Sequence, residues 1–134
     1  MYSKEGEAKR FVILDAAMND LIRPTLYSAY HEIIPVDEQG DDDKQVKVDV
    51  VGPVCETGDT FGKDRDLPDD LKAGDLVAVM SAGAYGAVMS STYNTRALTP
   101  EVLVKGNNFA IVRPRQEIDD LINMDQVPSW LSNA

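Results

Sequence analysis

One loop of this chain places a thiol beside carboxylates. The pentapeptide Cys55–Asp59 (CETGD) comes shortly after Gln45–Val51, a stretch of alternating apolar and polar residues. A cysteine near neutral pH is mostly thiol with some thiolate, so it can donate a proton or act as a nucleophile. Buried cysteines without reactivity are also common, so the residue types leave two interpretations of Cys55 open, a reactive group and a space-filling side chain.

Two further groups have the chemistry to contact an anion. In Gly83–Gly86 (GAYG) the glycines would let the backbone approach a ligand, and Tyr85 would offer one directional hydrogen bond. No Lys-Ser/Thr pair follows, so this is not a P-loop, and a structural turn remains the alternative. Arg23 and Tyr27 would share one helical face, where they could hold a carboxylate or form an ordinary surface salt bridge beside a half-buried tyrosine.

Composition narrows the class of protein. The 134 residues include 23 acidic and 13 basic side chains, a formal net charge of -10. Because binding of nucleic acids and anionic membranes relies on Lys and Arg, neither is an expected partner. There is no apolar run long enough to span a bilayer and no signal peptide. Cys55 is the only cysteine, which excludes an intrachain disulfide and a thiolate zinc site and favours a cytoplasmic location.

Short apolar runs between turn signals predict a β-rich fold. The clearest strand is Gln45–Val51, in which valines at every second position would share one face. The other predicted elements are strands at Phe11–Leu14, His31–Val36 and Leu76–Met80, a hairpin of Val102–Val104 with Phe109–Val112, and short helices near Leu26–Tyr30 and Glu117–Ile122. The pattern predicts an all-β barrel or sandwich with a few short helices, in a single domain covering residues 1–134.

The segments between these elements are predicted to be irregular. Gly52–Pro68 is rich in glycine and proline and predicts a loop, and Ser81–Gly86 predicts a small-residue turn. Asn19 offers a helix start, and Pro24 is expected to break any longer helix. The acidic stretch Asp37–Lys44 lacks the ligand spacing of a calcium loop and predicts a solvated hairpin turn. The single histidine is assigned no role.

Four segments together resemble one family, the diaminopimelate decarboxylases. They are DAAMNDLIRPTLYSAYH, VGPVCETGDTFGKDRDLP, GDLVAVMSAGAYGAVMSSTYN and PEVLV, in the family's order and at similar spacing. Related ornithine and arginine decarboxylases share the cysteine loop and the GAY turn but typically carry aspartate after the cysteine, where this chain has Glu56. The resemblance identifies the chain as the C-terminal β domain of such an enzyme, without the (β/α)8 barrel that holds pyridoxal 5'-phosphate.

The resemblance also implies roles for five residues. Cys55 would protonate the carbon left by decarboxylation, and Glu56 would pair with the distal ammonium of meso-diaminopimelate. In this family both usually reach into the site of the neighbouring subunit of a homodimer. Arg23 and Tyr27 would hold the distal carboxylate, and Tyr85 would hydrogen-bond the cofactor phosphate or lie beside the substrate. Arg23 and Glu56 supply the opposite charges that a zwitterionic distal end requires.

The lysine that binds the cofactor is not expected in this chain. None of the lysines stands in a sequence context that resembles the family's cofactor lysine. The isolated chain is therefore predicted to be inactive, and the full enzyme is predicted to convert meso-2,6-diaminopimelate to L-lysine. Two alternatives stay open: a self-standing β module used for binding or assembly, and a lyase for another basic amino acid.

Overall fold

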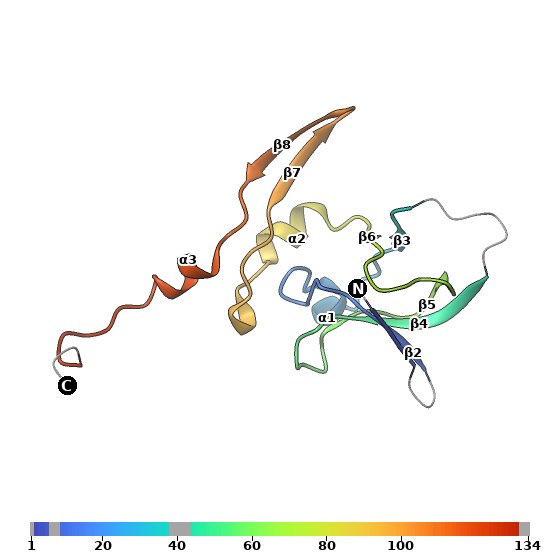
Figure 1. Cartoon of the computed structure of the whole chain (residues 1–134), viewed down its shortest axis with the longest axis horizontal. Helices are drawn as coiled ribbons and strands as arrows, with labels where there is room; N and C mark the ends of the chain where they lie inside the picture. The colour runs from blue at the N-terminus through green and yellow to red at the C-terminus, as the bar shows by residue number, and fades with distance from the viewer. Residues whose placement is uncertain (1, 6–8, 38–43, 132–134) are drawn as a thin grey trace. The chain divides into compact units, whose positions relative to one another are not determined.

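The chain divides into two compact units. The computed structural model describes residues 2–5, 9–37 and 44–131, and the units are Met1–Ser90 and Ser91–Ala134 (Figure 1). The first unit holds the larger sheet, the main apolar core and all five predicted site residues. The second holds a β-hairpin and a short helix. The expectation of a single domain over the whole chain stays a prediction.

The first unit is built on a four-stranded sheet with the strand order β1-β2-β4-β5. β1 pairs antiparallel with β2, β2 pairs parallel with β4, and β4 pairs antiparallel with β5. The strands are β1 (Tyr2–Glu5), β2 (Arg10–Ile13), β4 (Gln45–Val51) and β5 (Thr60–Pro68). The strand predicted at Gln45–Val51 is confirmed at both ends, because its alternating valines turn Val48 and Val50 into a core.

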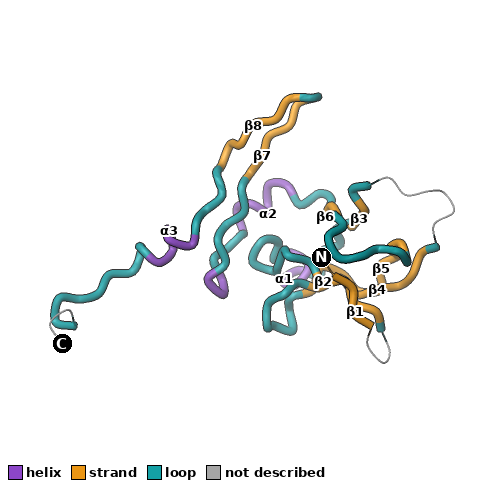
Figure 2. Tube along the Cα trace, viewed as in Figure 1, coloured by secondary structure: helices purple, strands orange, loops and turns teal. Residues whose placement is uncertain are grey.

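A second, smaller sheet completes the core of the first unit. It pairs β3 (Ile33–Pro35) antiparallel with β6 (Val77–Val79). The buried cluster that joins the two sheets is apolar throughout: Val12, Leu14, Leu21, Ile33, Val48, Val50, Phe61, Leu67 and Leu71. Two short helices, α1 (Arg23–Tyr27) and α2 (Gly83–Met89), flank it. Figure 2 shows how little of the first unit is helical and how much is strand.

One buried carboxylate shapes the strand pair β4–β5. Asp49 accepts a 2.9 Å hydrogen bond from the Asp64 amide and one of 3.1 Å from the Lys9 ammonium. The pairing register shifts here, and Asp64 has a φ of 51°, as expected for a β-bulge. Burial raises the pKa of Asp49, but the hydrogen bonds from Asp64 and Lys9 outweigh that effect and hold the pKa below its ordinary value of 3.8.

The second unit consists of few elements. β7 (Glu101–Lys105) and β8 (Asn108–Arg113) form an antiparallel hairpin, which confirms the hairpin predicted around Gly106-Asn107. A 3-10 turn, η1 (Tyr93–Thr95), precedes it and α3 (Ile118–Ile122) follows it. In α3, Glu117 and Asp120 form a capping box, which confirms the predicted helix start. The hairpin's apolar side chains are exposed, with Leu103 at 64% and Phe109 at 75%.

The expected fold class is confirmed, and three local predictions are wrong. The chain is mostly strand with three short α-helices, and within its described residues the strands form separate sheets rather than a closed barrel. The predicted loop Gly52–Pro68 contains the nine-residue strand β5, and the predicted turn around Gly83 is the helix α2. No helix begins at Asn19, because residues 18–20 form a turn and α1 begins only at Arg23, where Pro24 in the first turn loses no hydrogen bond. The turn predicted at Asp37–Lys44 lies almost wholly outside the described residues.

Candidate active site

Three of the five predicted site residues meet where α1 and α2 approach each other. The Arg23 guanidinium carbon lies 5.7 Å from the ring centroid of Tyr27 and 4.9 Å from that of Tyr85. Arg23 is half-buried, while the two tyrosines are 59% and 61% exposed. The structure therefore brings together two segments that are about sixty residues apart in the sequence.

Local sequence explains how each helix presents its side chain. α1 has Pro24 in its first turn and ends at Ser28, whose left-handed φ of 52° stops the helix after one turn and places Arg23 and Tyr27 four residues apart on one face. α2 is anchored at Gly86, which is its buried residue. Tyr85 directly precedes Gly86 in this helix, so the same anchoring holds Tyr85 beside Arg23.

The cluster has the electrostatics of an anion site. Guanidinium–ring contacts orient the Arg23 head group while its N–H donors remain able to bind a carboxylate in two-pronged fashion. In the described part of the chain, Arg23 forms no ion pair, and the Tyr85 hydroxyl forms no hydrogen bond. One cation and two phenols are thus available to a ligand on an exposed surface of the first unit.

The remaining two predicted residues lie at the tip of the loop between β4 and β5. Cys55 is a free, exposed thiol, so the space-filling interpretation of this residue is wrong. Glu56 is also exposed. A 2.9 Å hydrogen bond from the Gly52 amide to the Asp59 carbonyl closes the base of the loop. The structure places Cys55 in solvent, with no described contact to Arg23, Tyr27 or Tyr85.

The loop is nevertheless attached to α1. The Thr25 hydroxyl donates to the Gly58 carbonyl, and the Met18 amide donates to the Asp59 carboxylate over 2.7 Å. Figure 1 shows this loop, in green, next to α1. Thr25 and Asp59 were given no role by sequence reasoning. The only available signal was the unusual density of carboxylates in CETGD, because the partners of both side chains are distant in the sequence.

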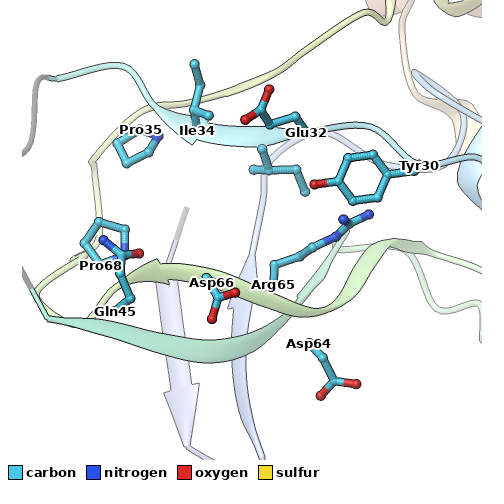
Figure 3. Close-up of a pocket in the computed structure, with 10 residues that line it drawn as sticks. Tyr30, Glu32, Ile34, Pro35, Gln45, Asp64, Arg65, Asp66 and Pro68 are labelled. Carbon is cyan, nitrogen blue, oxygen red and sulfur yellow. The ribbon is translucent and has the colours of Figure 1, made fainter.

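A second arginine–tyrosine pair lies elsewhere in the same unit. A cavity of about 510 Å³ lies between β3 and the β4–β5 pair. The Arg65 guanidinium lies 4.0 Å from the Tyr30 ring centroid, and Figure 3 shows the two side chains next to each other. Glu32, Asp64 and Asp66 also line this cavity. None of the five predicted site residues lines it, so Arg65 is a natural point of comparison for Arg23.

The described residues support neither a metal-binding group nor a membrane-spanning helix. No group of three or more His, Cys, Asp or Glu side chains in that part of the chain could hold a metal ion. Among the described helices, none has the length and apolarity to cross a membrane.

Comparison with protein families assigns the first unit. Residues 1–83 match the model of the pyridoxal-dependent decarboxylase C-terminal sheet domain, which is more than half of the chain. The chain belongs to this family. This confirms the resemblance stated from the sequence and the expectation of a C-terminal β domain. The family's description states that its members are pyridoxal-dependent decarboxylases, which indicates a pyridoxal cofactor.

Relatives and solved structures of this family are close to the chain. A diaminopimelate decarboxylase from Zymomonas mobilis is 55% identical over 128 residues, which cover 96% of this chain and 30% of that protein. The crystal structure of diaminopimelate decarboxylase from Helicobacter pylori complexed with L-lysine is 42% identical, with a TM-score of 0.83, covering 92% of this chain and 29% of that one. The chain thus spans about three tenths of the curated relatives it matches.

A more distant neighbour marks the limit of the comparison. A lysine/ornithine decarboxylase from Vibrio vulnificus is 23% identical, with a TM-score of 0.60 over 71% of this chain and 25% of that one. That likeness shows the fold alone. The roles of Arg23, Tyr27, Cys55, Glu56 and Tyr85 stay predictions.

Proposed function

We propose that this chain is the C-terminal sheet domain of a diaminopimelate decarboxylase, a cytoplasmic homodimer that converts meso-2,6-diaminopimelate to L-lysine with pyridoxal 5'-phosphate. The observation that carries the proposal is Arg23 held against Tyr27 and Tyr85, with Glu56 exposed on the neighbouring loop. The similarity to relatives with that name supports it.

The substrate's distal end determines which side chains are needed. It carries an ammonium and a carboxylate on one carbon, so a selective site must offer one anion and one cation. Arg23 and Tyr27 bind the carboxylate, and Glu56 binds the ammonium. A site of this kind rejects analogues that lack one charged group, because its own partner would then be left unpaired.

The reacting end of the substrate needs a proton donor. Pyridoxal phosphate, when bound, would supply the electron sink that decarboxylation needs. The Cys55 thiol then donates its proton to the carbon left by decarboxylation and is restored by solvent, to which it is exposed. We assign Cys55 and Glu56 to the site of the neighbouring subunit, since a solvent-exposed loop tip can reach across an interface.

Tyr85 fits a role at the cofactor. Its hydroxyl is exposed and without a hydrogen bond in the described part of the chain, so it can donate to a phosphate oxygen or lie beside the substrate. Three of the lysines fit the covalent role poorly. Lys9, Lys44 and Lys47 are engaged in ion pairs, and the hydrogen bond to Asp49 raises the pKa of Lys9, which disfavours the free amine. This supports a cofactor lysine outside this chain.

The exposed hairpin of the second unit fits a domain that packs against a larger partner. Apolar side chains such as Leu103, Phe109 and Ile111 are mostly exposed on it. Soluble proteins rarely expose a contiguous surface of this kind without a partner.

A hybrid enzyme tests the proposal. The matching segment of the Zymomonas mobilis relative is replaced by this chain, and carbon dioxide release is measured with diaminopimelate, lysine and ornithine. The proposal predicts turnover of diaminopimelate with a preference of at least about 100-fold over the other two, because each lacks the distal carboxylate. A preference for lysine or ornithine would favour the related lyases, and a folded hybrid without any turnover would favour the binding module.

A further inference from the structure

Two side chains without an assigned role connect the Cys55–Glu56 loop to α1 of the same chain. We propose that Asp59 and Thr25 are positioning residues that fix the Cys55–Glu56 loop tip relative to α1. This inference rests on the function proposed above, because that function requires each chain to present Cys55 and Glu56 to the neighbouring subunit from a defined position. It concerns contacts within the first unit only.

Asp59 is a buried carboxylate held by two backbone amides. One carboxylate oxygen accepts the Met18 amide over 2.7 Å, and the other accepts the Val54 amide over 2.7 Å. Asp59 is only 3% exposed. Val54 directly precedes Cys55, and Met18 lies in the turn that leads into α1. One side chain therefore binds both segments at once.

The chemistry of this contact requires a carboxylate. Each amide donates, so both side-chain oxygens must accept, which an ionised aspartate does and an asparagine cannot. An asparagine of the same size would turn its NH2 group toward one of the two donors. In the described residues no cation pairs with Asp59, so the two charge-assisted hydrogen bonds are what offset the loss of hydration on burial.

Gly52 completes the base of the loop. Its amide donates to the Asp59 carbonyl over 2.9 Å, and a Cβ at position 52 would overlap the Asp59 carboxylate. The carboxylate therefore occupies the space that any larger residue would need. This close approach explains a glycine directly after β4 on steric grounds alone.

Thr25 provides the second attachment, from α1 itself. Its hydroxyl donates to the Gly58 carbonyl, while a Cβ at Gly58 would lie 2.7 Å from the Thr25 methyl group. Thr25 stands between Arg23 and Tyr27 in the same helical turn. A shift of the loop would therefore be transmitted directly to the turn that carries both predicted carboxylate ligands.

Amide hydrogen exchange on the full 134-residue chain tests the attachment directly. In Asp59→Asn, exchange at Met18 or Val54 should accelerate by about tenfold or more, because a hydrogen bond to a charged group is lost. Asp75→Ala is the matched control, since the Asp75 carboxylate also accepts a backbone amide, that of Lys72, but lies in a different turn. It should leave exchange at Met18 and Val54 unchanged. Unchanged exchange in Asp59→Asn would overturn the proposal.

Kinetics of the hybrid enzyme test the functional consequence. Thr25→Val keeps the shape of the side chain but removes the donor, and Thr25→Ser keeps the donor. We expect Thr25→Val to lower kcat/KM for diaminopimelate by about fivefold to tenfold, the equivalent of one neutral hydrogen bond, and Thr25→Ser to retain wild-type kinetics. Asp59→Asn should lower kcat/KM further, measured well below its own unfolding temperature.

The two sets of data separate this proposal from the proposed function. If the hybrid enzyme is inactive as wild type, the proposed function fails, and the exchange data alone decide the attachment. If the wild type is active and Thr25→Val matches it while Thr25→Ser does not, the positioning role is wrong. Equal losses of kcat/KM in Asp59→Asn and Asp75→Ala would mean that Asp59 acts only through overall stability. That result would also contradict the positioning role.

Discussion

The two units of this chain treat their apolar residues in opposite ways. In the first unit, Val12, Val50 and Leu67 are almost completely buried between two sheets. In the second unit, the hairpin β7–β8 exposes Leu103, Phe109 and Ile111, although its strands are paired in regular register. Backbone pairing alone therefore does not make a core. Burial on the far side of a sheet supplies most of the stabilisation, and only the first unit has it.

This difference explains where the predicted site residues are found. A site requires side chains held in a fixed geometry by a rigid support. The Arg23 cluster and the Cys55 loop both attach to the buried core of the first unit, through α1, α2 and the β4–β5 connection. The hairpin of the second unit offers no comparable support within its own described residues.

The largest expected effect comes from truncating one leucine in each unit, which tests whether the two units differ in packing. Leu67→Ala removes a side chain that is 1% exposed and should reduce the free energy of unfolding by about 2–5 kcal/mol. Leu103→Ala removes one that is 64% exposed and should change it by less than about 0.5 kcal/mol. Urea unfolding followed by far-ultraviolet circular dichroism measures both. Similar losses would mean that the hairpin is as well packed as the sheet.

A smaller effect sharpens the comparison by asking whether the surface loop shares the packing of the first unit. Gly52→Ala places a methyl group against the Asp59 carboxylate and should destabilise by about 1–3 kcal/mol. Gly83→Ala at the start of α2 meets open space and should be neutral or stabilising by up to about 1 kcal/mol. Thermal unfolding distinguishes them, and the account fails here if Gly52→Ala unfolds at the wild-type temperature.

The smallest effect concerns charge on the first unit. Hydrogen bonds from Lys44 and Arg10 hold the pKa of Asp69 below its ordinary value of 3.8. A carboxylate whose pKa is lower in the folded state stabilises that state above the unfolded pKa, and the contribution disappears as pH falls through the folded pKa. The wild type should therefore lose stability below about pH 4.

Asp69→Asn isolates this contribution. The urea midpoint of the variant should depend less on pH than that of the wild type when pH 5 is compared with pH 3. Because the Lys44 side chain is 77% exposed and that of Asp69 is 40% exposed, high salt should reduce the difference between the two proteins. A variant with the same pH profile as the wild type would show that these ion pairs contribute nothing measurable.

Sequence patterns predicted the elements whose signals are local. Gln45–Val51 alternates cleanly, and the hairpin around Gly106-Asn107 has both a turn signal and apolar strands. β5 was missed because Gly62, Asp64 and Arg65 interrupt its pattern, and the buried Asp49 that stabilises the bulge lies on another strand. α2 was missed because its two glycines predict a turn, whereas in the fold Gly86 is the buried residue of a seven-residue helix.

The sequence proposed the five candidate site residues, but it did not predict the contacts that hold them in place. Family resemblance identified Arg23, Tyr27, Cys55, Glu56 and Tyr85 because their types and order are distinctive. Asp59 and Thr25 act on backbone groups 41 and 33 residues away, and no local pattern encodes such contacts. Their part in the site emerged only when the fold brought those segments together.

The central claim is that Arg23, rather than any arginine stacked on a tyrosine, binds the substrate. The hybrid enzyme carrying Arg23→Met should lose on the order of 100-fold or more in kcat/KM for diaminopimelate, because the distal carboxylate loses its cationic partner. Arg65→Met removes the guanidinium that stacks on Tyr30 at 4.0 Å and serves as the matched control. It should retain kcat/KM within about threefold, because none of the five predicted site residues lines either of the cavities to which Arg65 contributes. Equal losses in the two variants, or full activity in Arg23→Met, would contradict the account.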